Sequence, residues 1–198
     1  MTEAFSIRTY LRDIPLPFCL GCGNITIMDY FLRAVHELGY KDLCKFVFFS
    51  GIGCAAWIPS PHFEADSIHT THGRSIPVAT GVKLVRPELN VVVFGGDGDL
   101  VGIGLSHLIH AARRNVDIKV ILVNNMIYGM TGGQVAPTTP FKAKTTTTPY
   151  GSFERPLDAT RLVVAAGASY AARWTTIHGV QLKEAMKKML TTEGFAFV

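Results

Sequence analysis

Several features are scarce or missing in this 198-residue sequence, and each absence narrows the possible functions. It has no uninterrupted apolar run of the roughly 18 residues that a transmembrane helix needs, and its N-terminus lacks the pattern of a secretory leader. It also has no long run of Lys or Arg, although its net charge is +4. We therefore expect a cytoplasmic protein that binds neither a membrane nor nucleic acid.

Cysteine is scarce too, with four residues in a chain that is 48% hydrophobic. A chain of this size and composition can bury one α/β core without disulfides, and we expect a single domain over residues 1–198. Cys19 and Cys22 form a C-x-x-C pair, which favours metal or redox chemistry. Residues 1–16 show no periodicity, and nearby prolines favour extended backbone, so this segment is predicted to be a surface arm.

The clearest structural pattern is a βαβ unit over residues 90–128. Residues 90–94 and 118–123 are short β-branched apolar runs, and residues 100–113 between them have the spacing of an amphipathic helix. Further helices are predicted at residues 25–38, 75–84, 158–166 and 180–190, and further strands at 45–50, 169–172 and 195–198. This alternation predicts an α/β fold with an open, mostly parallel sheet and helices on both faces.

Polar residues follow both strands of the βαβ unit, as GGDGD at residues 95–99 and NN at 124–125. Parallel strands joined by a right-handed crossover bring these ends to one edge of the sheet, where open α/β sheets bind ligands. Asp97 and Asn125 would offer a carboxylate and an amide oxygen, which suit Mg²⁺. The glycines of GGDGD and the start of the next helix would admit a bound diphosphate.

GGDGD is compatible with two other interpretations. A dinucleotide-binding G-x-G-x-x-G would need glycine where the chain has Val101, which argues against it. Asp97 and Asp99 could also be ordinary turn and helix-capping residues. The later Asn pair favours the Mg²⁺ site over that interpretation.

Five motifs occur in order along the chain: CLGCG at residues 19–23, GIGC at 51–54, HTTHGR at 69–74, GGDGD at 95–99 and NNMIYGMTGGQ at 124–134. GDG followed by NN after the roughly 30 residues of a βαβ unit is similar to the thiamine diphosphate signature. With the other motifs, the chain resembles the β subunits of 2-oxoacid:ferredoxin oxidoreductases over residues 17–198. The resemblance implies the diphosphate-binding half of the thiamine diphosphate-binding fold.

The resemblance also implies a set of cofactor contacts. Mg²⁺ would be held by Asp97, Asn125 and the carbonyl of Ile127. The residues implied along thiamine diphosphate are Ile52, Gly53, Cys54, Ala55, His72, Gly73, Gly98, Asp99, Gly129 and Met130. No catalytic residue is assigned, because the glutamate that activates the cofactor is expected from a partner subunit.

The cysteines suggest a second cofactor. Thiolates at Cys19 and Cys22 on one turn could hold a metal ion or a cluster corner, with Cys54 at another strand end as a third ligand. In the resembled family these three positions bind a [4Fe-4S] cluster, and its fourth ligand is expected beyond Val198, in a chain that we take to be incomplete at its C-terminus. Cys44 is expected to be a buried core residue. A Zn²⁺ ion held by the same three cysteines and a histidine is the alternative.

Two further segments are predicted to be loops. Residues 59–77 contain His62, His69 and His72, but H-x-x-H alone is weak evidence for a metal, and the resemblance involves only His72. Residues 129–156 have no periodicity, are rich in Gly, Thr and Pro, and leave from the Mg²⁺ end of a strand. This second segment is predicted to form an active-site lid or a subunit contact, with a mobile surface loop as the alternative.

The implied function is that of a β subunit active only with an α subunit. The enzyme would oxidatively decarboxylate a 2-oxoacid, with 2-oxoglutarate favoured, transfer the acyl group to coenzyme A, and pass electrons through the [4Fe-4S] cluster to ferredoxin. Thiamine diphosphate would supply the carbanion chemistry. The cation for the second carboxylate of 2-oxoglutarate could be Arg74, Lys142, Lys144 or a partner residue. The alternatives are a non-enzymatic Zn²⁺- or Fe-S-clipped docking module and a non-oxidative thiamine diphosphate enzyme, and the cysteines argue against the latter.

Overall fold

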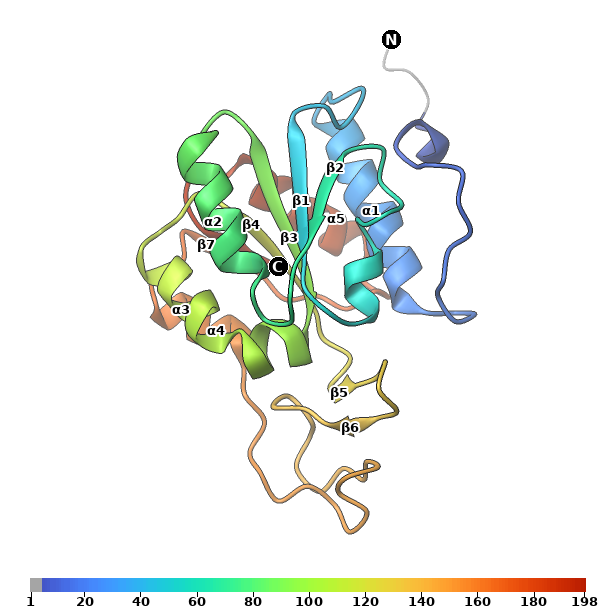
Figure 1. Ribbon diagram of the computed structural model, residues 1–198, viewed down its shortest axis with the longest axis vertical. Coiled ribbons are helices and arrows are strands. Elements are labelled where there is room, and N and C mark those ends of the chain that lie inside the picture. The colour runs from blue at the N-terminus through green and yellow to red at the C-terminus, as the bar shows by residue number, and fades with distance from the viewer. Residues whose placement is uncertain (1–4) are drawn as a thin grey trace.

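The computed structural model describes residues 5–198, and its centre is a six-stranded sheet. Neighbouring strands are all parallel and follow the order β2-β1-β3-β4-β8-β7 (Figure 1). The strands are β1 (Phe46–Ser50), β2 (Asp66–His69), β3 (Asn90–Gly96), β4 (Lys119–Val123), β7 (Tyr170–Ala171) and β8 (Ala196–Phe197). The predicted open parallel sheet is confirmed.

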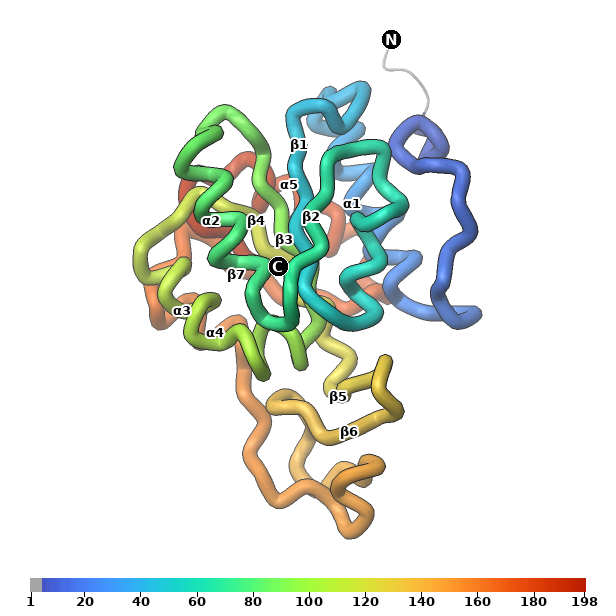
Figure 2. Tube along the Cα trace, in the orientation of Figure 1, coloured from blue at the N-terminus to red at the C-terminus, as the bar shows by residue number. Residues whose placement is uncertain are grey.

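Helices cover both faces of this sheet, as predicted. The helices α1 (Gly23–Glu37) and α5 (Gly179–Thr191) pack on one face, and α2 (Ser75–Val85), α3 (Leu105–Arg113) and α4 (Ala159–Ala165) on the other (Figures 1 and 2). Shorter helical turns are η1 (Ile7–Thr9), η2 (Cys54–Trp57) and the π-helical η3 (Gly98–Ile103). In the described part of the chain, no helix combines the length and apolar character needed to cross a membrane.

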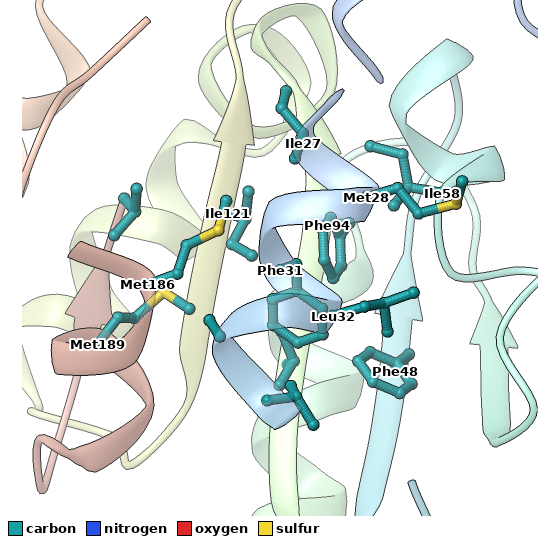
Figure 3. Packing of buried hydrophobic residues seen from close by; sticks show 14 of the residues in the cluster. Ile27, Met28, Phe31, Leu32, Phe48, Ile58, Phe94, Ile121, Met186 and Met189 are labelled. Carbon is teal, nitrogen blue, oxygen red and sulfur yellow. The ribbon is translucent and has the colours of Figure 1, made fainter. Parts of the chain in front are cut away.

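The alternation of side chains along β3 explains the two apolar cores. Val92 and Phe94 point toward α1 and α5, whereas Val91 and Val93 point toward α2 and α3. On the first face, Phe31 of α1 meets Phe94 edge to face, with ring centroids 5.2 Å apart (Figure 3). Such a pair contributes about 1 kcal/mol beyond the burial of its area. Packing on both faces thus fixes the strand whose carboxyl end carries GGDGD.

The direction of strand addition reverses between β1 and β3. From β1 the chain goes to β2 on one side, and it then returns to β3 on the other. Ligands of open α/β sheets bind at the carboxyl ends of the strands at such a point. The segments that follow β1, β2, β3 and β4 contain the GIGC, HGR, GGDGD and NN motifs, so the topology brings these motifs to one edge.

Three local predictions were wrong. Residues 59–77 are not all loop, because β2 lies within them and pairs with β1; its mostly exposed side chains gave no apolar pattern. Residues 129–156 are not structureless, because β6 (Gln134–Val135) pairs antiparallel with β5 (Ile127–Tyr128). Cys44 is exposed rather than buried, because it lies in the turn before β1, where its N–H donates to Asp42.

The predicted surface arm is tied to the body more firmly than expected. Within its described residues 5–16, Tyr10 is 1% exposed and belongs to the core under α1. Its hydroxyl donates to the carbonyl of Tyr40 across 2.7 Å, and Leu11 forms an isolated bridge to Phe63. The rest of the arm, residues 1–4, lies outside the described residues.

Candidate functional site

A cavity of about 650 Å³ opens at the carboxyl edge of the sheet. Its walls come from the segments after β1, β3 and β4, from the turn at Cys19 and Cys22, and from residues 172–176 after β7. The predicted site residues that line it are Cys19, Cys22, Ile52, Gly53, Cys54, Ala55, His72, Asp97, Gly98, Asp99, Asn125, Ile127, Gly129 and Met130. Gly73 is buried and does not line the cavity. A cavity of this volume is large enough for an organic cofactor.

Asp97 begins the turn after β3 and is 1% exposed. Burial raises the pKa of its carboxyl above the ordinary value, although the Thr138 hydroxyl and nearby backbone N–H groups, including that of Asn125, act in the opposite direction. The Thr138 hydroxyl donates to Oδ2 of Asp97. The donors that reach this carboxylate from residues 5–198 are neutral. A divalent cation would stabilise its buried charge further.

Asn125 lies in the turn that follows β4, and Ile127 is the first residue of β5. Asn125 Oδ1 accepts a hydrogen bond from the Ile127 N–H at 3.2 Å, and Met126 between them has a left-handed backbone with φ of 63°. Because β3 and β4 are neighbours with Gly96 opposite Val123, this turn starts beside Asp97. A carboxylate, an amide oxygen and a backbone carbonyl are hard donors, and this set fits Mg²⁺.

Asp99 connects three of the strand-end segments. Its Oδ1 accepts hydrogen bonds from the backbone N–H groups of Ile52 at 3.1 Å and Gly73 at 2.7 Å, and lies 2.7 Å from Nδ1 of His72. Its Oδ2 is buried without a hydrogen-bond partner among the described residues. Asp99 therefore sets the relative positions of the segments after β1, β2 and β3. The Gly73 N–H is engaged by Asp99, and its predicted contact with a diphosphate stays a prediction.

Gly98 has a packing role at this edge. A Cβ at Gly98 would lie 2.2 Å from Cε1 of Tyr128, which is far inside van der Waals contact. The Tyr128 hydroxyl donates to the Gly98 carbonyl across 3.3 Å, and burial raises the pKa of Tyr128. The absence of a side chain at Gly98 thus lets the tyrosine ring close over the turn after β3.

The thiols of Cys19, Cys22 and Cys54 line the same cavity. Burial raises the pKa of the Cys54 thiol, and the neighbouring Cys22 and Cys19 raise it further, so the three groups are close enough to interact. Within residues 5–198, no three His, Cys, Asp or Glu side chains are gathered tightly enough for a single metal ion. The alternative of a Zn²⁺ ion held by these cysteines and a histidine stays a prediction. The [4Fe-4S] ligand set stays a prediction.

The three histidines of residues 59–77 do not converge. His62 is buried, and its Nδ1 lies 2.5 Å from the carbonyl of Trp57. The ring of His69 lies 3.3 Å from the Ser50 hydroxyl. His72 alone of the three lines the cavity.

Sequence reasoning missed several residues of the site. Arg173 lines the cavity just after β7, with its guanidinium 3.7 Å from Oδ2 of Asp158. The cations considered from the sequence, Arg74, Lys142 and Lys144, do not line it. A position just after a predicted strand was the one signal that pointed to Arg173. Thr138 lies in a segment without periodicity, and nothing in the sequence indicated its contact with Asp97.

The parallel sheet with a cavity at its carboxyl edge is that of an α/β cofactor-binding domain, and the family comparison names the cofactor as thiamine diphosphate. The profile described as "Thiamine pyrophosphate enzyme, C-terminal TPP binding domain" matches residues 51–198. The chain is also 53% identical over 191 residues to the 2-oxoglutarate synthase subunit KorB of Methanocaldococcus jannaschii, with 96% of this chain and 70% of that protein covered. It is 41% identical to the 2-oxoacid:ferredoxin oxidoreductase subunit beta of Saccharolobus solfataricus, with 91% and 59% covered.

A solved structure gives the same result. The chain superposes with a TM-score of 0.91 and 38% identity on the 2-oxoglutarate:ferredoxin oxidoreductase from Magnetococcus marinus. That structure has 2-oxoglutarate, coenzyme A and succinyl-CoA bound, and the match covers 100% of this chain and 67% of that one. The chain therefore belongs to the β-subunit family of the 2-oxoacid:ferredoxin oxidoreductases, which confirms the resemblance carried by its motifs. It is part of an oxidoreductase rather than a docking module.

Proposed function

We propose that this chain is the cofactor-binding β subunit of an enzyme that oxidatively decarboxylates 2-oxoglutarate, with coenzyme A as acyl acceptor and ferredoxin as electron acceptor. The observation that carries the proposal is that Asp97 and the turn at Asn125 and Ile127 line one cavity with Cys19, Cys22 and Cys54. The names of relatives that are 53% and 52% identical, both 2-oxoglutarate synthase subunits, support the choice of substrate.

Different residues of the chain would bind Mg²⁺, the diphosphate and the iron-sulfur cluster. Asp97, Asn125 and the Ile127 carbonyl would hold Mg²⁺, and the turn at Gly98 would take the diphosphate. When bound, thiamine diphosphate supplies the carbanion-stabilising chemistry of decarboxylation. Cys19, Cys22 and Cys54, on the same cavity wall, would hold a [4Fe-4S] cluster that carries electrons toward ferredoxin. The four cysteines are free thiols, which fits a reducing compartment such as the cytoplasm.

An α subunit would complete the active site. In the described part of the chain, no glutamate lines the cavity, although a glutamate is the group expected to activate the cofactor. We therefore place that group in the partner. The β chain alone should bind Mg²⁺ and the diphosphate end of the cofactor but should be inactive.

Arg173 supports a dicarboxylic substrate. It is the one Arg or Lys on the cavity wall formed by residues 5–198, and its neighbour Asp158 lies at a loose 3.7 Å. A guanidinium that is not held in a close ion pair can rotate toward a substrate carboxylate and form a bidentate pair of hydrogen bonds with it. We assign this role to Arg173 in place of the cations considered from the sequence.

The experiment is to produce the chain together with its α subunit under anaerobic conditions and to measure ferredoxin reduction with a panel of 2-oxoacids. We expect the highest kcat/KM with 2-oxoglutarate, and no activity without coenzyme A or the α subunit. Arg173→Gln should lower kcat/KM for 2-oxoglutarate by roughly tenfold to a hundredfold, the worth of a charged hydrogen bond, and change that for pyruvate much less. Equal losses on both acids would contradict the role of Arg173, and a preference for a monocarboxylic acid would contradict the substrate.

A further inference from the structure

The adjacent residues Thr138 and Thr139 connect the segment 129–156 to both halves of the proposed metal site. The Thr138 hydroxyl donates to Oδ2 of Asp97 from the turn after β3. The Thr139 hydroxyl donates to the carbonyl of Met126 across 2.7 Å and accepts from the N–H of Ala136 at 2.8 Å. Both threonines are 4% exposed, so water competes little for these bonds.

Each threonine constrains a different oxygen donor. Thr138 restrains the carboxylate rotation of Asp97, and it uses one lone pair of Oδ2 while leaving the others for a cation. Thr139 holds Met126, the residue between Asn125 and Ile127. A left-handed backbone at Met126 costs on the order of 1 kcal/mol, which the bond from Thr139 helps to offset. The two hydroxyls of this dipeptide therefore position the proposed metal-binding oxygens at both strand ends.

The remainder of the segment is folded around this anchor. Leu157 donates to the carbonyl of Pro137 at 2.8 Å, and buried Ser152 donates to that of Ala143 at 2.9 Å. The segment extends away from the carboxyl edge of the sheet (Figures 1 and 2), and Tyr150 within it is fully exposed. Substitution of the two threonines would therefore disturb the packing of the whole segment rather than that of one side chain.

We propose that Thr138 and Thr139 are positioning residues through which Mg²⁺ binding and the packing of the segment 129–156 stabilise each other. This inference rests on the proposed Mg²⁺-diphosphate site. Because coupling between two equilibria is reciprocal, the factor by which the packed segment tightens metal binding equals the factor by which the metal stabilises the packed segment. The metal site and the segment then order together when the cofactor binds.

The test uses the complex with its α subunit and two measurements. Mn²⁺ in place of Mg²⁺, with thiamine diphosphate present, reports metal affinity by electron paramagnetic resonance. Hydrogen exchange across residues 136–157, with and without metal and cofactor, reports how far binding protects the segment. Thr138→Val should weaken metal binding roughly tenfold or more, the worth of a hydrogen bond to a charged group, and reduce the protection by the same factor. Thr138→Ser, which keeps the hydroxyl, should restore both.

Thr145→Val is the matched control in the same segment. The Thr145 hydroxyl lies 2.7 Å from that of Thr148 and contacts neither Thr138 nor Thr139. Its loss should change exchange around residues 145–148 without unpacking residues 136–139, and it should leave metal affinity unchanged. Wild-type affinity in Thr138→Val would overturn the inference, and so would tighter binding, which would show that Thr138 competes with the metal. Failure of the wild-type complex to bind metal with cofactor would instead contradict the proposed function.

Discussion

A hydrogen bond of 2.7 Å from the Gly73 N–H to Oδ1 of Asp99 joins the segment after β2 to the turn after β3. The same oxygen accepts the Ile52 N–H, so one buried carboxylate oxygen holds segments that follow three different strands. These are the segments that carry the GIGC, HGR and GGDGD motifs. The relative positions of these three segments therefore depend on the buried carboxylate of Asp99.

Asp99→Ala should therefore destabilise the chain and loosen cofactor binding together. It leaves the N–H groups of Ile52 and Gly73 without their acceptor, and we expect a loss of about 2–4 kcal/mol in the free energy of unfolding. Urea unfolding measures this loss. Asp13→Ala, at an exposed carboxylate, is the control and should change stability by less than about 0.5 kcal/mol. Equal effects of the two substitutions would contradict the linking role of Asp99.

Asp97→Ala should separate binding from folding. The side chain supplies the one charged oxygen among the proposed Mg²⁺ ligands, so we expect Mg²⁺-dependent affinity for thiamine diphosphate to fall by on the order of a hundredfold or more. Because ionised Asp97 is buried without a cationic partner among the described residues, the metal-free fold should survive. Calorimetric titration gives the affinity and thermal unfolding the stability; unchanged cofactor affinity would disprove the Mg²⁺ assignment.

Gly98→Ala should distort the cofactor site because the added methyl group would collide with the ring of Tyr128. The added Cβ would lie 2.2 Å from Cε1 of the ring, so the ring or the turn has to move. Tyr128→Ala would clear the space, and Gly98→Ala combined with Tyr128→Ala should be more stable than the sum of the single effects predicts. We expect a coupling of about 1–3 kcal/mol in a double-mutant cycle of unfolding. Additive effects would show that the ring relaxes without cost.

The sequence indicated those parts of the molecule that depend on local pattern. The apolar runs of β3 and β4 and the polar residues after them predicted neighbouring strands and a shared edge, because a buried parallel strand has a recognisable composition. At the sheet edge, β2 has mostly exposed side chains, so its four residues carry no such pattern. Thr138 and Asp97 are 41 positions apart, and their contact depends on how residues 129–156 fold back. No local rule predicts that path.

Glu37 should give α1 and α5 an acid-sensitive link. Its carboxylate pairs with Lys183 and, at 3.1 Å, with Lys187, and the hydrogen bond from Lys183 is the largest of the effects that lower the pKa of Glu37. The folded pKa thus lies below the unfolded value of about 4.3. The stabilisation is fully present above the unfolded pKa and is lost as the pH falls through the folded pKa.

Glu37→Gln should therefore cost about 0.5 kcal/mol of unfolding free energy at pH 7, a small value because the three side chains are partly exposed. The difference from wild type should disappear well below the folded pKa. Urea unfolding at a series of pH values measures it. Glu154→Gln, at an exposed glutamate, is the control. A difference that grows on acidification would show the sign to be wrong.

Cys54→Ser should remove iron from the complex, whereas Cys44→Ser should not. Cys54 lines the same cavity as Cys19 and Cys22, and burial, followed by these two neighbouring cysteines, raises the pKa of its thiol. Cys44 is exposed in the turn before β1, at the opposite end of that strand from the cavity. A thiolate at that end cannot reach a cluster at the other without unpairing the strand.

Iron, sulfide and zinc analysis of the complex made anaerobically, with electron paramagnetic resonance after reduction, would compare these two variants with the wild type. Cys19→Ser and Cys22→Ser should lose iron and the reduced-cluster signal together with Cys54→Ser, because each removes one thiolate of the same set. Activity with 2-oxoglutarate should fall in these three variants and persist in Cys44→Ser. Zinc in place of iron in the wild type would contradict the proposed cluster. Loss of iron in Cys44→Ser would show that Cys44 is a ligand and that the proposed ligand set is wrong.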